Sequence, residues 1–140
     1  MSRVFFTDRD LGKQFPNILA AAGLKVERHA DHFKPECPDD EWLDAVGKKG
    51  WVAISHDRRI RYKPNELQAV VRHGVALLVV VGKASFPILA QNFVATAPRI
   101  LDFLDTHTAP FIAKVYRPLP SDLAKRADAP GAVSLWYPKK

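Results

Sequence analysis

The sequence predicts an α/β fold, in which a central, mainly parallel sheet lies between two layers of helices. Short apolar segments, typical of buried strands, alternate along the chain with longer segments that have helical spacing. This alternation is typical of a parallel sheet that carries helices on both faces. The most apolar segment, 75–81, is expected at the centre of the sheet, where both of its faces are buried.

Most of the predicted strands are short apolar runs bounded by glycine, proline or charged residues. The predicted strands are 4–7, 24–29, 51–55, 75–81 and 111–116. Between them, helical spacing and helix-ending residues predict four helices. The predicted helices are 11–22, 39–48, 65–72 and 85–105.

The positions of proline residues predict one loop and one interruption of a helix. The segment 30–38 contains two prolines and no periodicity, and is predicted to be a loop. Pro98 falls inside the last helix, where the missing N–H should kink the helix or split it in two. Thr96 is then a candidate cap for the second half.

The chain of 140 residues is long enough for one domain with a substantial apolar core. We expect a domain over residues 1–117 and an extended tail over residues 118–140, because four prolines follow Arg117. Trp136 and Tyr137 near the end of this tail are expected to pack on this chain or on another one. The single cysteine, Cys37, excludes an intramolecular disulfide.

The apolar runs of this chain are too short to predict a membrane span, and the longest has seven residues. Asp8 and Asp10 also interrupt the position where the apolar part of a signal peptide would lie. We therefore expect a cytoplasmic protein with no membrane partner.

Charge is unevenly distributed along the chain. Residues 1–57 hold 8 Lys and Arg against 10 Asp and Glu, a net charge of −2, whereas residues 58–140 hold 13 against 5, a net charge of +8. The overall charge of +6 favours a polyanionic partner. An acidic first part and a basic remainder fit a cation site beside a phosphate-binding surface.

Acidic residues follow two of the predicted strands and begin one helix. Asp8 ends the first strand, with Asp10 two residues later, and Asp57 follows the third strand. The carboxyl ends of parallel strands meet at one edge of a sheet, where ligands bind. The helix beginning near residue 39 starts with Asp39-Asp40-Glu41. Such acids also occur as turn residues or as favourable charges in a first helical turn.

Crowded carboxylates repel one another and favour a bound cation. Oxygen ligands select Mg²⁺ or Mn²⁺, which activate water and stabilise the leaving oxygen in phosphodiester hydrolysis. His29, His32 and Cys37 offer atoms compatible with zinc, but their spacing matches no standard zinc pattern. A run of basic residues after Asp57 is suited to hold a phosphate backbone. It consists of Arg58, Arg59, Arg61 and Lys63.

These segments, in this order, resemble the PIN-like domains, most closely the compact branch that includes VapC-type toxins of toxin–antitoxin modules. The resemblance rests on Val-Phe-Phe-Thr-Asp8-Arg-Asp-Leu, Pro-Asp39-Asp-Glu-Trp-Leu and Trp-Val-Ala-Ile-Ser-His-Asp57-Arg-Arg-Ile, and extends over residues 4–116. It implies a three-layer α/β/α domain that uses Mg²⁺ or Mn²⁺ to cut RNA. It also implies a cognate antitoxin as partner and, as in many members, a homodimer.

The resemblance also implies roles for individual acids. Asp8 matches the acid that ends the first strand, Asp39 the leading acid of the helical motif, and Asp57 the acid after the later strand. These three are the expected catalytic and metal-binding residues, with Asp10, Asp40 and Glu41 as further candidate ligands. The sequence lacks a clear fourth acid after Asp57, so the site could hold either one metal ion or two.

Three other functions remain open at this point. The first is a PIN-like module that binds RNA or a partner without catalysis. The second is a receiver-like domain with Asp57 as phosphoacceptor, which needs a lysine past its last parallel strand, whereas Lys114 falls inside the strand. The third is a haloacid-dehalogenase-like phosphatase built on Asp8 and Asp10, but the paired-acid motif that it needs further along is missing.

Overall fold

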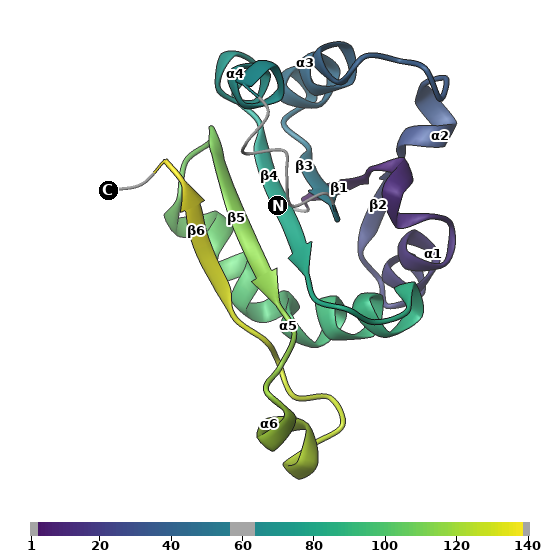
Figure 1. The fold of residues 1–140 in the computed structure, drawn as a ribbon, viewed down its shortest axis with the longest axis vertical. Coiled ribbons are helices and arrows are strands. Elements are labelled where there is room, and N and C mark those ends of the chain that lie inside the picture. The colour runs from purple at the N-terminus through teal and green to yellow at the C-terminus, as the bar shows by residue number, and fades with distance from the viewer. Residues whose placement is uncertain (1–2, 57–63, 139–140) are drawn as a thin grey trace.

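A computed structural model describes residues 3–56 and 64–138 of the protein. It contains one six-stranded sheet in the order β2-β1-β3-β4-β5-β6, with β2 at one edge and β6 at the other (Figure 1). The first five strands are parallel and β6 is antiparallel to β5. The strands are β1 Val4–Thr7, β2 Lys25–Arg28, β3 Val52–Ser55, β4 Ala76–Val81, β5 Phe111–Tyr116 and β6 Val133–Tyr137.

The described helices lie between these strands. They are the 3₁₀ helix η1 Arg9–Leu11, α1 Gln14–Ala21, α2 His29–His32, α3 Asp39–Lys49, α4 Pro64–Arg72, α5 Phe86–Thr106 and α6 Pro120–Lys125. The α/β class, the mainly parallel sheet and the five predicted strands are therefore confirmed, as is the central position of the 75–81 segment.

Alternating side chains of the strands form two separate apolar cores, one on each face of the sheet. Phe5 and Ile54 belong to the core under α1 and α5, while Phe6 and Ala53 belong to the core under α3 and α4. The molecule thus has the three layers expected of an α/β/α domain. Burial of both faces explains why the central strands read as continuous apolar runs rather than alternating ones.

The sequence predicted that Pro98 kinks or splits the helix; α5 is continuous over Phe86–Thr106, so Pro98 does not split it. Thr96 does not act as a cap but lies inside the helix, where its hydroxyl donates to the carbonyl of Asn92 at 2.7 Å. Buried side chains before and after Pro98, such as Phe93 and Ile100, pack on the same core. Packing along the whole helix therefore outweighs the loss of one backbone hydrogen bond.

The sequence predicted an extended tail after Arg117, but this segment is not uniformly extended. It forms α6 and then β6, which pairs with β5 and completes the edge of the sheet (Figure 1). Pro130 and Pro138 flank β6 without interrupting it, so the strand loses no backbone donor. Trp136 and Tyr137 pack against the core under α3 and α4, within this chain. The division of the chain at residue 117 remains a prediction.

Two smaller differences concern loops. The predicted loop 30–38 begins with the short helix α2, and only the remainder is irregular. At the end of α3, Gly50 has φ +69°, a left-handed conformation that glycine adopts without strain and that ends the helix before β3. Among the described residues, no helix combines the length and the apolar character needed to cross a membrane.

Candidate functional site

The chain changes direction across the sheet between β1 and β3. From β1 it proceeds to β2 on one side, and then returns to β3 on the other side. In open parallel sheets, ligands bind beyond the carboxyl ends of the strands at such a switch point. Asp8 and His56, the residues that follow β1 and β3, both lie at this edge.

Asp8 is fixed at the switch point by its own backbone. Its N–H donates to the carbonyl of Ile54 in β3 at 3.0 Å, and its carboxylate accepts from the N–H of Arg9 at 2.7 Å. The side chain thereby caps η1 and remains half-buried. The sequence predicted an acid at this edge of the sheet, and the structure places Asp8 there.

Asp10 connects η1 to the end of β3. Its Oδ2 accepts from the hydroxyl of Ser55 and from the N–H of His56, each at 3.0 Å. Ser55 is completely buried, so this contact joins the two strand ends from within. In the structure, Asp10 holds the backbone just before Asp57, whereas the sequence suggested it as a further metal ligand.

Asp39 lies in the first turn of α3, which runs back toward the start of β3 and therefore begins at the carboxyl edge. Its Oδ1 accepts from the indole N–H of Trp42 at 2.8 Å. Trp42 is buried and packs against Phe6 and His29, at the ends of β1 and β2. The negative charge of Asp39 acts on His29, where it opposes the lowering of the pKa of that side chain. The fold thus brings Asp39 to the edge that holds Asp8.

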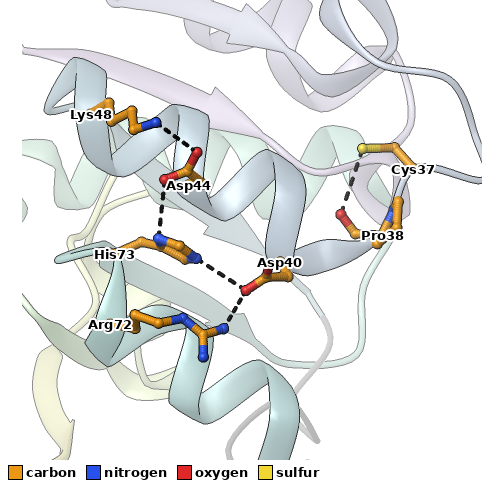
Figure 2. Close-up of polar contacts among 7 residues, drawn as sticks. All are labelled: Cys37, Pro38, Asp40, Asp44, Lys48, Arg72 and His73. Carbon is orange, nitrogen blue, oxygen red and sulfur yellow. Dashed lines mark hydrogen bonds and ion pairs between the residues drawn. The ribbon is translucent and has the colours of Figure 1, made fainter.

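Asp40 points toward α4 rather than toward the strand ends (Figure 2). Its Oδ1 contacts the guanidinium of Arg72 and, at 3.0 Å, Nε2 of His73. The hydrogen bonds from His73 and Arg72 lower the pKa of the Asp40 carboxyl. The other ring nitrogen of His73 lies 3.1 Å from Asp44, so this cluster fastens α3 to α4.

Glu41 is also engaged by a neighbour. Its Oε2 accepts from the thiol of Cys37 at 2.9 Å. Burial and the Glu41 carboxylate raise the pKa of the Cys37 thiol to about 11, which keeps the thiol protonated at neutral pH. These contacts occupy one oxygen of each carboxylate, Oδ1 of Asp40 and Oε2 of Glu41.

The remaining predicted site residues lie outside the described part of the chain. They are Asp57, Arg58, Arg59, Arg61 and Lys63. Within residues 3–56 and 64–138, no cluster of three or more His, Cys, Asp or Glu side chains is arranged to hold a metal ion. The carboxylates of Asp8 and Asp39 have the chemistry that Mg²⁺ or Mn²⁺ requires, and the third predicted ligand is Asp57.

The zinc-compatible atoms of the 29–37 segment have separate partners. His29 Nδ1 accepts from Arg9 Nε at 2.9 Å, His32 Nε2 lies 2.7 Å from Glu27, and the thiol of Cys37 donates to Glu41. These contacts account for the three side chains without zinc.

Sequence reasoning missed a pocket beside the acids, at the carboxyl ends of β1 and β2. It has a volume of ≈ 200 Å³ and carries three basic side chains. It is lined by Thr7, Asp8, Arg9, Gly12, Lys13, Arg28, His29 and Ala30. The basic residues after β1 and at the end of β2 were a signal of this pocket, but only the pairing of these strands brings them together.

His29 forms one buried wall of this pocket. Burial in the first place, and then the charge of Arg9, lower its pKa. The imidazole is therefore neutral at neutral pH, as the hydrogen bond from Arg9 to its Nδ1 requires.

Lys114 bears on the receiver-like alternative. Its side chain belongs to the middle of β5, and its ammonium lies 4.1 Å from the ring centroid of Trp136. It is therefore not at the carboxyl end of the last parallel strand, where a receiver-like domain requires its lysine.

Comparison with known proteins identifies the family. A family model described as a PIN like domain matches residues 3–82, more than half of the chain and the part that carries Asp8, Asp39 and Asp57. No curated protein and no solved structure matches the chain. The family match and the mainly parallel α/β/α architecture agree with each other, and the chain belongs to the family of PIN-like domains.

Proposed function

We propose that this protein is a Mg²⁺- or Mn²⁺-dependent endoribonuclease and the toxin of a toxin–antitoxin module. The observation that carries the proposal is the position of Asp8 and of the Asp10-bound end of β3 at the switch point of a PIN-like sheet, with Asp39 in the first turn of α3. PIN domains are generally nucleases, and a hard divalent cation is the usual partner of carboxylates in phosphodiester hydrolysis.

In this proposal Asp8, Asp39 and Asp57 hold the metal ion, directly or through water. The bound ion supplies a water of lowered pKa and neutralises charge on the phosphate. Asp8 is oriented by the N–H of Arg9 and by its backbone bond to β3. The Asp10 bonds to Ser55 and His56 fix the chain immediately before Asp57. Arg58, Arg59, Arg61 and Lys63 bind the RNA backbone on either side of the scissile phosphate.

The direct test is cleavage of a pool of structured RNAs by the purified protein in Mn²⁺, in Mg²⁺ and in EDTA. Wild type should cut only with metal, and Asp8→Asn and Asp57→Asn should both lose cleavage while they retain RNA affinity. Asp102→Asn is the matched control, because Asp102 is exposed on α5 away from the carboxyl edge. Cleavage that survives in Asp8→Asn and Asp57→Asn would refute the assignment of these residues.

The toxin role needs a test in cells. Induced expression should arrest growth, and the Asp8→Asn variant should not. A partner antitoxin, which we expect to be encoded nearby, should restore growth and copurify with the protein. Size-exclusion chromatography with light scattering then tests the proposed homodimer. Growth that is unaffected by an active nuclease would remove the toxin role alone.

A non-catalytic RNA- or partner-binding module is the second candidate. It is favoured by the engagement of Asp40 with Arg72 and His73, and of Glu41 with Cys37, because these contacts occupy one carboxylate oxygen of each of two candidate ligands. It predicts salt-sensitive RNA binding without turnover in any metal. The cleavage assay above, combined with an RNA-binding assay in EDTA, separates the two functions.

A further inference from the structure

The pocket at the carboxyl ends of β1 and β2 carries an excess of positive charge. Three of its lining side chains, Arg9, Lys13 and Arg28, are basic, and Asp8 is its single acid. Its volume of ≈ 200 Å³ is below the range of about 300–1,000 Å³ that is usual for whole small-molecule ligands. The pocket is therefore suited to one charged group of a larger ligand.

Thr7, one of the residues that line the pocket, has a buried hydroxyl that the fold leaves unsatisfied. Thr7 is 1% exposed, and of the buried side-chain polar atoms in the described residues only its Oγ1 lacks a hydrogen-bond partner. Thr7 lies on the same face of β1 as Phe5, the face covered by α1. Because buried polar groups are almost always paired in folded proteins, an unpaired hydroxyl on a residue that lines a pocket points to a ligand that completes it.

Two of the basic side chains are held in place by the fold. Arg28 makes two hydrogen bonds to Asp31, at 2.9 and 3.1 Å. Arg9 donates from Nε to His29 and from a terminal nitrogen to the carbonyl of Phe33 at 2.7 Å. These contacts restrict both guanidinium groups before any ligand arrives, which reduces the entropy lost on binding.

Lys13 differs from these arginines, because among the described residues it takes part in none of the ion pairs. Its ammonium can therefore bind an anion without giving up an existing partner. A threonine hydroxyl next to lysine and arginine donors is a combination that proteins use to contact nucleic-acid phosphates.

We propose that this pocket binds one backbone phosphate of the RNA. The Lys13 ammonium donates to the phosphate, the Thr7 hydroxyl becomes a second donor when its side chain rotates toward the phosphate, and Arg9 and Arg28 supply further positive charge. The assignment of RNA as the source of the phosphate rests on the proposed function, whereas the pocket itself does not. The site lies on the β2 side of Asp8, so the bound phosphate belongs to a nucleotide flanking the one that is cut. It positions the strand and takes no part in the chemical step.

The test measures binding of labelled single-stranded RNA in EDTA, so that no cleavage can occur. Thr7→Val removes the hydroxyl without changing the shape and should weaken binding about tenfold, as expected for a hydrogen bond to a charged group. Thr7→Ser should retain most of the affinity. Lys13→Gln should weaken binding and reduce the slope of log K against log salt by about 0.7, the value for one contact to a single strand.

The matched control is Lys25→Gln. Lys25 is an exposed lysine at the amino end of β2, whereas the pocket lies at its carboxyl end, so its substitution removes the same charge outside the pocket. In a second arm, inorganic phosphate should displace RNA from wild type and from Lys25→Gln at lower concentrations than from Thr7→Val.

Each result has a defined meaning. Loss of RNA affinity in Thr7→Val and Lys13→Gln, with Thr7→Ser and Lys25→Gln near wild type, supports the proposal. Loss of phosphate binding with unchanged RNA affinity overturns RNA as the source and leaves a site for free phosphate. Losses no greater than in Lys25→Gln overturn the pocket. If the cleavage assay fails while RNA binding still depends on Thr7, the nuclease function falls and the phosphate site stands.

Discussion

Two buried threonines show how differently two regions of this molecule are built. Thr96, in α5, is completely buried, and its hydroxyl both donates to Asn92 at 2.7 Å and accepts from the N–H of Gly131 at 2.9 Å. Thr7, at the end of β1, is equally buried, but its hydroxyl has no partner among the described residues. At the junction where α5 contacts the chain before β6, the buried hydroxyl has its hydrogen-bond partners within the protein, whereas the buried hydroxyl at the pocket has none among the described residues.

This difference separates structural from functional polar groups. A satisfied buried hydroxyl stabilises the fold, and its removal leaves another buried group unpaired. An unsatisfied one costs stability in the free protein and is retained where a ligand completes it. Substitutions in the two regions should therefore change the free energy of unfolding in opposite directions.

The largest expected effect comes from Gly131, the backbone partner of Thr96. A Cβ at this position would lie 1.7 Å from the carbonyl oxygen of Tyr116, so the backbone would have to move. Gly131→Ala should lower the free energy of unfolding by about 3 kcal/mol or more, as measured by denaturant titration. Ala132→Ser is the control, because this neighbouring side chain is exposed. A variant as stable as wild type would show that this junction does not hold β6 in place.

Thr96→Val breaks the same junction without adding atoms to it. It leaves the N–H of Gly131 without its hydroxyl acceptor in a buried position. The free energy of unfolding should fall by about 1–3 kcal/mol. Thermal and chemical unfolding should agree, and Thr96→Ser should recover most of the loss. An unchanged stability would contradict the structural role of this hydroxyl.

Thr7→Val makes the identical chemical change in the pocket and should have the opposite sign. It removes an unpaired buried hydroxyl, so the free energy of unfolding should rise by about 1 kcal/mol in the absence of RNA. The same variant is expected to bind RNA more weakly. Destabilisation comparable to that of Thr96→Val would show that Thr7 has a partner in the free protein.

The pocket should also respond to acid through His29. Burial and Arg9 lower its pKa in the folded state below the ordinary value of 6.5, so the unfolded chain binds the proton more readily. The fold is therefore more stable when His29 is neutral. The free energy of unfolding has its full value above pH 6.5 and decreases as the pH falls from 6.5 toward the folded-state pKa of His29. His29→Phe, which preserves an aromatic ring against Phe6 and Trp42, should flatten this part of the stability profile. An equally steep loss in the variant would assign the acid sensitivity to other groups.

The first five strands were predictable because each is a short segment between clear breaks, and all but β2 are largely buried. Asp8 could be placed at the carboxyl edge for the same reason, since a parallel sheet fixes where its strands end. The prolines around residues 133–137 hid β6, whose partner β5 is supplied only by the tertiary fold. The pocket was also beyond sequence reasoning, because an unpaired hydroxyl such as that of Thr7 depends on every neighbour in three dimensions.

The smallest expected effect tests whether burial, rather than pairing alone, gives these polar contacts their value. Asp40 is paired with Arg72 and His73, as fully as Thr96 is with its partners, but its side chain is 61% exposed. Solvent screens such contacts, so Asp40→Asn should lower the free energy of unfolding by much less than Thr96→Val does, and by less still in high salt. Because the pKa of the Asp40 carboxyl is lowered in the folded state, wild type should lose this contribution as the pH falls through that pKa. A loss as large as that of Thr96→Val would mean that pairing matters more than burial in this fold, and that the contrast between the two threonines has another cause.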